Sequence, residues 1–219
     1  MSRMPLYILF FALSLHAELT IIDKPIIFNE ERIALSKQYI QQHYGLKVKD
    51  VHIKTRIVVV HWTAINDFNR SFQRFVEPTL PSDRPDIQKA SALNVSTHFM
   101  VDRDGTIYRL MPETLMGRHI IGLNYSAIGI ENVGGEQNID NLTQAQLKAN
   151  IALIKYLQQR HPALEYLIGH HEYTDFTEHP LWLEKDEHYR TTKYDPGEAF
   201  MHKLRKHFPT LKSATKEMP

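Results

Sequence analysis

The order of hydrophobic and polar positions predicts strands and helices that alternate along most of the chain. Uninterrupted apolar runs at 56–61 and 126–133, and a shorter one at 167–169, are typical of buried strands. Two further runs, 96–101 and 106–110, flank an Asp-Gly turn and predict a β-hairpin. We therefore expect an α/β fold, with a single domain built on a central mixed β-sheet flanked by helices.

Apolar residues return at helical spacing in three other segments, at 29–43, 143–160 and 198–207. Asn29 is a suitable N-cap for the first helix, and Gly45 a suitable stop. Thr143 and Gln146 form the pattern of a capping box at the start of the second. Residues 66–92 are polar and proline-containing, which predicts a long irregular loop with a helical turn. Residues 171–192 show no clear period and also predict a loop.

The N-terminus has the pattern of a secretory signal peptide. Arg3 precedes a largely apolar run of about ten residues at 6–15, and Ala17 stands before the charged Glu18. The run is shorter than the ~20 residues that a membrane span needs. We expect cleavage after Ala17, export to the periplasm or the medium, and no stable membrane anchor afterwards. The alternative is a buried N-terminal strand or helix. After cleavage at Ala17, residues 18–211 would form the domain and residues 212–219 a flexible tail.

Charge and cysteine content limit which partners and which metal ligands the chain can use. Removal of residues 1–17 leaves 25 basic and 25 acidic residues, and no dense Lys/Arg block occurs, so nucleic acid is not an expected partner. No protein partner is predicted either. The chain has no cysteine but 13 histidines, so any metal ion must be held by His, Asp or Glu.

Two histidine positions follow predicted strands. His61 ends the apolar run 58–60, and a residue at a strand end can project into a cleft. Taken alone, such a histidine is more often a hydrogen-bonded core residue. His170 and His171 both follow the run 167–169, and adjacent residues on an extended chain point to opposite sides. The residues themselves leave the choice between His170 and His171 open.

Three charged residues complete the candidate site. Lys193 and Asp195 are two positions apart and would share a face of an extended chain, although an exposed turn is the simpler interpretation. Glu131 lies inside the apolar run 126–133. Burial there would raise its pKa toward the range of a general base, whereas an edge strand would leave it in solvent.

Together these residues suggest a zinc site. Two histidines and one carboxylate are a usual protein ligand set for catalytic Zn²⁺, with a fourth position left for water. A carboxylate can accept the water's proton, and a lysine can stabilise a developing oxyanion. These are the parts needed for amide hydrolysis. The His-Glu-x-x-His motif of many metalloproteases is absent from the sequence.

Five segments in order resemble one family. They are 58–63 (VVVHWT), 96–99 (STHF) with 102–108 (DRDGTIY), 126–131 (SAIGIE), 168–170 (IGH) and 193–197 (KYDPG). In this order they are similar to the zinc-dependent N-acetylmuramoyl-L-alanine amidases, whose fold is shared with phage amidase lysozymes and peptidoglycan recognition proteins. The resemblance spans about residues 56–208, the expected catalytic core.

The resemblance assigns roles to individual residues. It implies that His61, His170 and Asp195 bind Zn²⁺, with His170 preferred to His171 because the family's ligand directly follows glycine. It also implies that Glu131 and Lys193 are catalytic. The expected reaction is hydrolysis of the amide bond between N-acetylmuramic acid and L-alanine in peptidoglycan or muropeptides.

Some features depart from the family pattern or leave alternatives. The segment between His170 and Lys193 is longer than in compact bacterial amidases, and it is expected to form a wall or lid of a substrate groove or a simple surface loop. His119 lies where the family often has a groove histidine, with a poor local match. His98 is expected to have a packing or supporting role. The alternative functions are a non-catalytic peptidoglycan-binding module and a zinc peptidase that cuts within the stem peptide.

Overall fold

A six-stranded mixed sheet forms the centre of the computed structural model, which describes residues 19–82 and 85–213. The strand order is β1-β4-β3-β5-β2-β6, and every neighbouring pair is parallel except the hairpin pair β3 and β4. The strands are β1 (Ile21–Asp23), β2 (Ile57–Trp62), β3 (Phe99–Val101), β4 (Ile107–Arg109), β5 (Ala127–Asn132) and β6 (Tyr166–Gly169). The predicted fold class, α/β with a mixed sheet in one domain, is confirmed.

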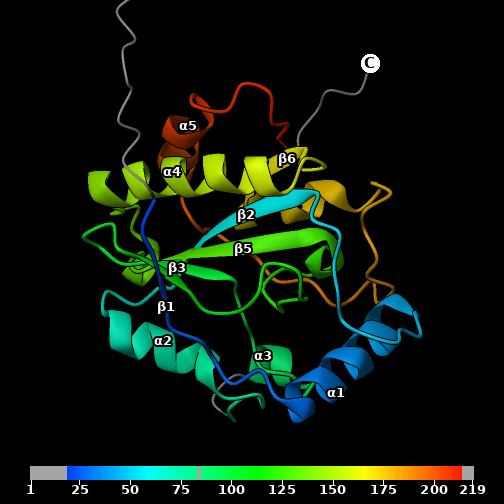
Figure 1. Ribbon diagram of the computed structural model, residues 1–219. Coiled ribbons are helices and arrows are strands. Elements are labelled where there is room, and N and C mark those ends of the chain that lie inside the picture. The colour runs from blue at the N-terminus through cyan, green and yellow to red at the C-terminus, as the bar shows by residue number, and fades with distance from the viewer. Residues whose placement is uncertain (1–18, 83–84, 214–219) are drawn as a thin grey trace, which may run out of the picture.

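Helices cover both faces of this sheet (Figure 1). On one side lie α4 (Gln144–Arg160) and α5 (Glu198–Arg205). On the other lie α1 (Glu30–Tyr39), α2 (Phe68–Val76) and the short α3 (Pro85–Gln88). The result is a layered arrangement in which the central strands β2 and β5 are buried on both faces.

Successive side chains of β2 point to opposite faces of the sheet and pack into two different hydrophobic cores. Val58 and Val60 pack into the hydrophobic core shared with α4 and α5. Ile57 and Val59 point the other way, into a second core under the segment that follows β6. Since side chains alternate along a strand, His61 lies on the face of Val59, away from α4.

The predicted helix starts are present. Thr143 accepts a hydrogen bond from Gln146 N (3.1 Å), and the Gln146 side chain accepts one from Thr143 N (2.9 Å), which together close the capping box of α4. The Asn29 side chain caps α1 through Arg32 N. After α1 the chain continues as a π-helical turn, Ile40–Tyr44, and stops at Gly45 with a left-handed backbone.

The prediction for residues 66–92 is wrong in part, because 68–76 form the regular helix α2. Asp67 caps this helix by accepting a hydrogen bond from Arg70 N (2.7 Å). Phe72 and Phe75 are buried on its inner face. An Asp cap followed by aromatic residues at positions 68, 72 and 75 indicates a helix. The loop prediction gives more weight to the prolines, which lie after this helix.

The edge strand β1 and the 3₁₀ helix that follows β6 are not predicted from the sequence. The edge strand β1 is three residues long and half exposed, so it carries no readable periodicity. Residues 170–176 form a 3₁₀ helix within the segment predicted as a loop. Its Tyr173 and Phe176 are buried in the second core, which explains why this turn is ordered.

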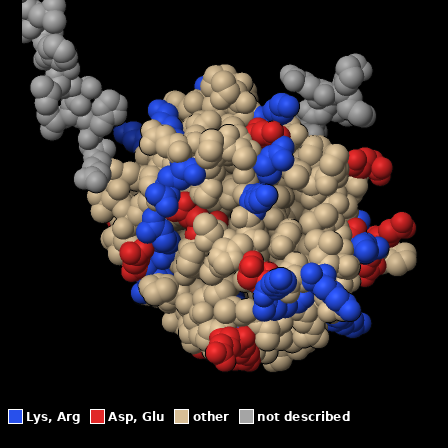
Figure 2. All heavy atoms as spheres, turned by 45° about the vertical axis from the view of Figure 1, so that its right-hand side comes forward, with Lys and Arg blue, Asp and Glu red and all other residues tan. Residues whose placement is uncertain are grey.

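The expected signal peptide, residues 1–17, lies outside the described residues, as does most of the expected tail. Within 19–82 and 85–213, none of the helices combines the length and apolar character needed to cross a bilayer. Figure 2 shows Lys and Arg side chains interspersed with Asp and Glu over one face of the molecule.

Candidate metal and catalytic site

The candidate site lies where the parallel strands β2, β5 and β6 end. Adjacent parallel strands place their carboxyl ends at the same edge of a sheet, where loops can build a pocket. A cavity of about 440 Å³ opens there. All five residues proposed from the sequence line it: His61, Glu131, His170, Lys193 and Asp195.

Strand register brings three of these residues into one row. His61 on β2 is paired with Glu131 on β5. On the other side of β2, Val60 is paired with Gly169, the last residue of β6, and His170 follows directly. Because paired residues in a sheet project to the same face, the sheet itself positions one carboxylate and two imidazoles along a single edge.

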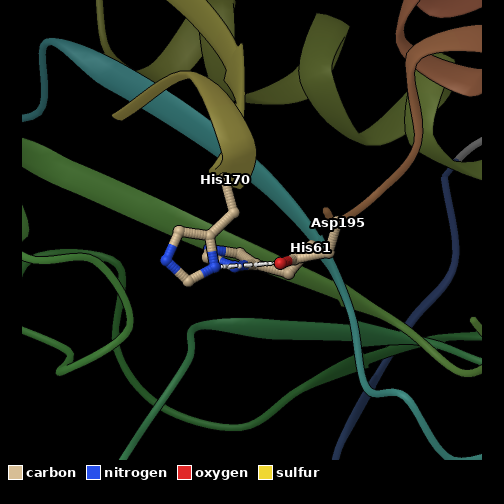
Figure 3. A group of neighbouring side chains, drawn as sticks. All are labelled: His61, His170 and Asp195. Atoms are coloured by element: carbon tan, nitrogen blue, oxygen red, sulfur yellow. Dashed lines mark hydrogen bonds and ion pairs between the residues drawn. The ribbon is translucent and has the colours of Figure 1, made fainter. Parts of the chain in front are cut away.

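His61, His170 and Asp195 converge on one point (Figure 3), and we refer to them as the His-His-Asp cluster. His61 Nδ1 lies 2.9 Å from His170 Nδ1 and 3.1 Å from Asp195 Oδ2, and His170 Nδ1 lies 3.0 Å from the same oxygen. One ligand atom from each residue falls within 4.8 Å of the others, and all three residues are buried. Two imidazole nitrogens and a carboxylate oxygen in this arrangement fit a Zn²⁺ ion.

Adjacent His170 and His171 point to different places. His170 joins the cluster, whereas His171 Nδ1 lies 2.9 Å from the backbone oxygen of Asp195 and the ring lines a separate hollow beside α5. His171 N also donates to the Asp195 carbonyl (3.0 Å). His171 therefore holds the backbone at Asp195 while His170 meets its carboxylate.

Electrostatics within the cluster favour the forms that bind metal. Burial lowers the pKa of His170 to about 4, so the ring is neutral at pH 7 and retains a free lone pair. Burial by itself would raise the pKa of Asp195. The adjacent His170 and His61 rings outweigh that effect and keep this pKa below its usual range, so the carboxylate is ionised.

Glu131 and Lys193 also line the cavity, one from strand β5 and the other from the loop before α5. Glu131 is buried at 8% exposure in the middle of the sheet, as predicted, and does not lie on a solvent-facing edge strand. Lys193 is half-buried on the loop that carries Asp195. The cavity therefore combines a carboxylate set in the sheet with a cation on a loop.

Several cavity residues were not proposed from the sequence. Helix α2 contributes Arg74 and Phe75 to one wall, and Tyr189 and Thr191 line the cavity from the long segment after His170. The C-terminal end of that segment therefore lines the cavity, and its role as a wall or lid of a substrate groove stays a prediction. Because the sequence analysis predicts a loop at 68–76, it does not place Arg74 and Phe75 at the site. The periodic aromatic residues of α2 are the signal in the sequence that indicates this helix.

Two histidines lie behind the cluster. His119 Nδ1 is 3.0 Å from His61 Nε2, and burial together with the neighbouring His61 lowers the pKa of His119 well below its usual value. His98 donates toward Leu115 O (2.8 Å) and accepts from Gly129 N (3.0 Å), and burial lowers its pKa to about 4. His98 packs against His119, with ring centroids 5.8 Å apart, and has no hydrogen bond to the three residues of the cluster.

The fold and site define a class: an α/β protein with a buried two-histidine, one-carboxylate cluster at the edge of a mixed sheet. Residues 52–198, about two thirds of the chain, match the family model described as N-acetylmuramoyl-L-alanine amidase. The chain belongs to this family.

Curated relatives support the same family. The endolysin of Escherichia phage T7 is 34% identical over 84 residues, which cover 36% of this chain and 55% of the endolysin. The endolysin of Klebsiella phage KP32 is 32% identical over an alignment of the same extent. The chain spans about half the length of the curated relatives it matches.

Solved structures share the fold. AmpD is 20% identical, with 85% of this chain and 93% of AmpD covered and a TM-score of 0.52. The peptidoglycan recognition protein LE, solved in complex with tracheal cytotoxin, is 15% identical, with 88% and 95% covered and a TM-score of 0.52. The predicted membership of the N-acetylmuramoyl-L-alanine amidase family is confirmed, and the fold is shared with AmpD and with peptidoglycan recognition protein LE.

Proposed function

We propose that this protein is a zinc-dependent amidase that hydrolyses the bond between N-acetylmuramic acid and L-alanine in peptidoglycan or muropeptides. The observation that carries the proposal is the buried His-His-Asp cluster, which opens into a cavity also lined by Glu131 and Lys193. Membership of the N-acetylmuramoyl-L-alanine amidase family supplies the bond to be cut.

His61, His170 and Asp195 are the proposed metal ligands, through Nδ1, Nδ1 and Oδ2, the atoms that face one another. A zinc ion bound there would promote ionisation of a water molecule near neutral pH and polarise the scissile carbonyl. The three ligands come from two rigid strand ends and a loop held by His171, so little reorganisation is needed.

Glu131 is the proposed general base. Its carboxylate shares the row of His61 on the sheet and can accept the proton of the attacking water, then return it to the departing L-alanine nitrogen. Lys193 is proposed to donate to the carbonyl oxygen as negative charge develops there. Both groups touch the reacting atoms in this scheme and are therefore proposed as catalytic residues.

The test is mass spectrometry of the products formed from purified muropeptides, with zinc and again after chelation. Release of an intact stem peptide beginning with L-alanine, only when zinc is present, is the expected result. Cleavage at a bond within the stem would assign a zinc peptidase instead. Binding of muropeptide without any cleavage would assign a recognition module.

We also propose that the protein acts outside the cytoplasm, where peptidoglycan lies. The proposal is supported by the signal-peptide pattern of residues 1–17 and by the wall-degrading family to which the chain belongs. N-terminal sequencing of protein recovered from an exporting host should begin near Glu18. An intact Met1 or Ser2 would contradict export through this segment.

A further inference from the structure

His119 occupies the space behind His61, on the side away from the other two members of the cluster. His61 presents Nδ1 to His170 and Asp195, and its other ring nitrogen, Nε2, lies 3.0 Å from His119 Nδ1. The two rings are nearly perpendicular, at 87°, with centroids 5.1 Å apart. Each nitrogen of His61 therefore has a different partner.

The hydrogen-bond partners determine where the protons lie. His119 Nε2 is 3.3 Å from the backbone oxygen of Ala127, which can only accept, so His119 carries its proton on Nε2. In the neutral ring, Nδ1 is then an acceptor. His61 must donate to it from Nε2, and this leaves the lone pair of His61 on Nδ1, the atom that faces the metal position.

The surroundings are shaped to hold this ring. The backbone N–H groups of His119 and Ile120 both donate to Asn124 Oδ1 at 2.8 Å, which fixes the turn that carries the ring. Gly129 leaves the necessary room on β5, because a Cβ there would come within 2.9 Å of His119 Cγ and Nδ1. His119 itself is 8% exposed. An anchored backbone and a glycine against the ring face give His119 a defined orientation.

We propose that His119 is a positioning residue that fixes His61 in the Nε2–H tautomer, so that His61 Nδ1 is free to bind the metal. This inference rests on the metal site of the proposed function. Hydrogen bonds to the outer nitrogen of a metal-bound histidine set both its tautomer and its orientation, and their loss typically weakens metal binding 10–100-fold. His119 also lines the cavity, and the role proposed for it here is to orient His61.

The first test measures zinc affinity by competition with a chromophoric chelator. His119→Ala should weaken zinc binding about 10–100-fold. His119→Gln should recover most of the affinity, because the amide oxygen can accept from His61 Nε2–H. The matched control is His161→Gln, which alters a partly buried imidazole whose partner is Glu113, away from His61 and His119. The zinc affinity of the control variant should stay within about threefold of the wild-type value, well below the 10–100-fold loss expected for His119→Ala.

The second test locates the protons in the zinc-loaded wild-type protein. With ¹⁵N-labelled histidine, NMR should show His61 protonated on Nε2 and coupled through that hydrogen to His119 Nδ1. A proton on His119 Nδ1, wild-type zinc affinity in His119→Ala, or no rescue by His119→Gln would overturn the proposal. So would failure of the wild type to bind zinc.

Neither readout depends on amide hydrolysis. If zinc binds and the His119 variants behave as expected while no substrate is cleaved, the catalytic proposal fails and the positioning role stands. If cleavage is normal and His119→Ala binds zinc like the wild type, only the positioning role fails.

Discussion

At the scale of single residues, Lys193 and Asp195 share one short loop but differ in surroundings. Asp195 is buried against two imidazoles, while Lys193 is half-buried and reaches the cavity. In the proposed mechanism, this position would let the Lys193 side chain approach the scissile carbonyl without the desolvation cost of a fully buried site. This arrangement suits an oxyanion donor that acts in the transition state.

Lys193→Ala should therefore reduce kcat by about a hundredfold or more, by analogy with the loss of one oxyanion donor. Zinc content and fold should be unchanged, since Lys193 is not among the proposed ligands. Steady-state kinetics on a purified muropeptide is the measurement. Lys185→Ala, which removes an exposed lysine away from the cavity, is the control. Near-normal turnover in Lys193→Ala would remove the proposed role.

His98 makes a second residue-scale prediction, on pH and stability. Burial lowers its pKa in the folded state to about 4, against about 6.5 in the unfolded chain. Between these values the unfolded state binds more protons, so the free energy of unfolding rises with pH. The stability from neutral His98 is fully present above about pH 6.5 and is lost as pH falls toward 4. The loss is on the order of 3 kcal/mol.

Urea unfolding of metal-free protein at pH 7 and pH 4.5 measures this effect. Wild type should lose more stability between the two pH values than His98→Gln, which has no imidazole at this position. Comparing the two variants cancels the contributions of the other titrating groups. Equal losses would show that His98 is not held neutral in the fold.

At the scale of elements, the long segment after His170 is fastened to the rest of the molecule at two points. Phe176 is buried in the second core. Glu184 is also buried, and both of its carboxylate oxygens lie 3.0 Å from His43 Nδ1, at the π-helical turn after α1. His43 Nε2 in turn lies 3.0 Å from Ala90 O. The His43 ring therefore lies between the Glu184 carboxylate and the Ala90 carbonyl and links the segment to two other parts of the chain.

Glu184→Ala leaves the buried His43 ring and the backbone N–H of Asp186 without their hydrogen-bond partner and should destabilise the protein by about 1–3 kcal/mol. It should also raise KM, because Tyr189 and Thr191 on the same segment line the cavity. Urea unfolding and steady-state kinetics are the measurements. Glu187→Ala, an exposed residue three positions along, should be within about 0.5 kcal/mol of the wild type. A Glu184 variant as stable as the control would contradict this account.

A single substitution is a cleaner test of the segment than a deletion. Removing 176–188 would take away Phe176, a buried core residue, and any loss of activity could follow from unfolding.

Tyr189 is held by a hydrogen bond from Arg118 to its hydroxyl (3.1 Å), so the wall of the cavity depends on contacts outside the segment.

At the scale of the whole molecule, the proposed zinc ligands come from three distant parts of the chain. A ligand that binds only the folded state stabilises it by about 2.7 kcal/mol when present at 100 times its Kd. For a protein of this size that free energy corresponds to a rise in Tm of roughly 5–10 °C. We expect this rise for the wild type and little or none for Asp195→Asn.

Thermal unfolding of chelator-treated protein, with and without added zinc, measures the shift. Magnesium serves as the control ion because it prefers oxygen ligands and should leave Tm unchanged. An equal shift in wild type and Asp195→Asn would place zinc somewhere other than the His-His-Asp cluster.

Local pattern in the sequence determined much of the fold. Buried strands such as β2 are uninterrupted apolar runs, and the start of α4 is encoded in the side chains of Thr143 and Gln146. Each of these two signals is contained in a few neighbouring residues, so each can be recognised without knowledge of the rest of the chain. Strand β1 has no such signal, since three half-exposed residues are ordered by pairing with β4.

The sequence by itself also determined the chemistry available: without cysteine, a metal must bind histidine and carboxylate, and five motifs in order resemble one family. The tertiary structure decided which side chains meet. His170 rather than His171 faces His61, because the pairing of Val60 with Gly169 places His170 beside His61 at the strand ends. His119 lies 58 positions from His61, and a contact at that distance along the chain leaves no local pattern. Only the packing of β2 against β5 and the room left by Gly129 bring the two rings together.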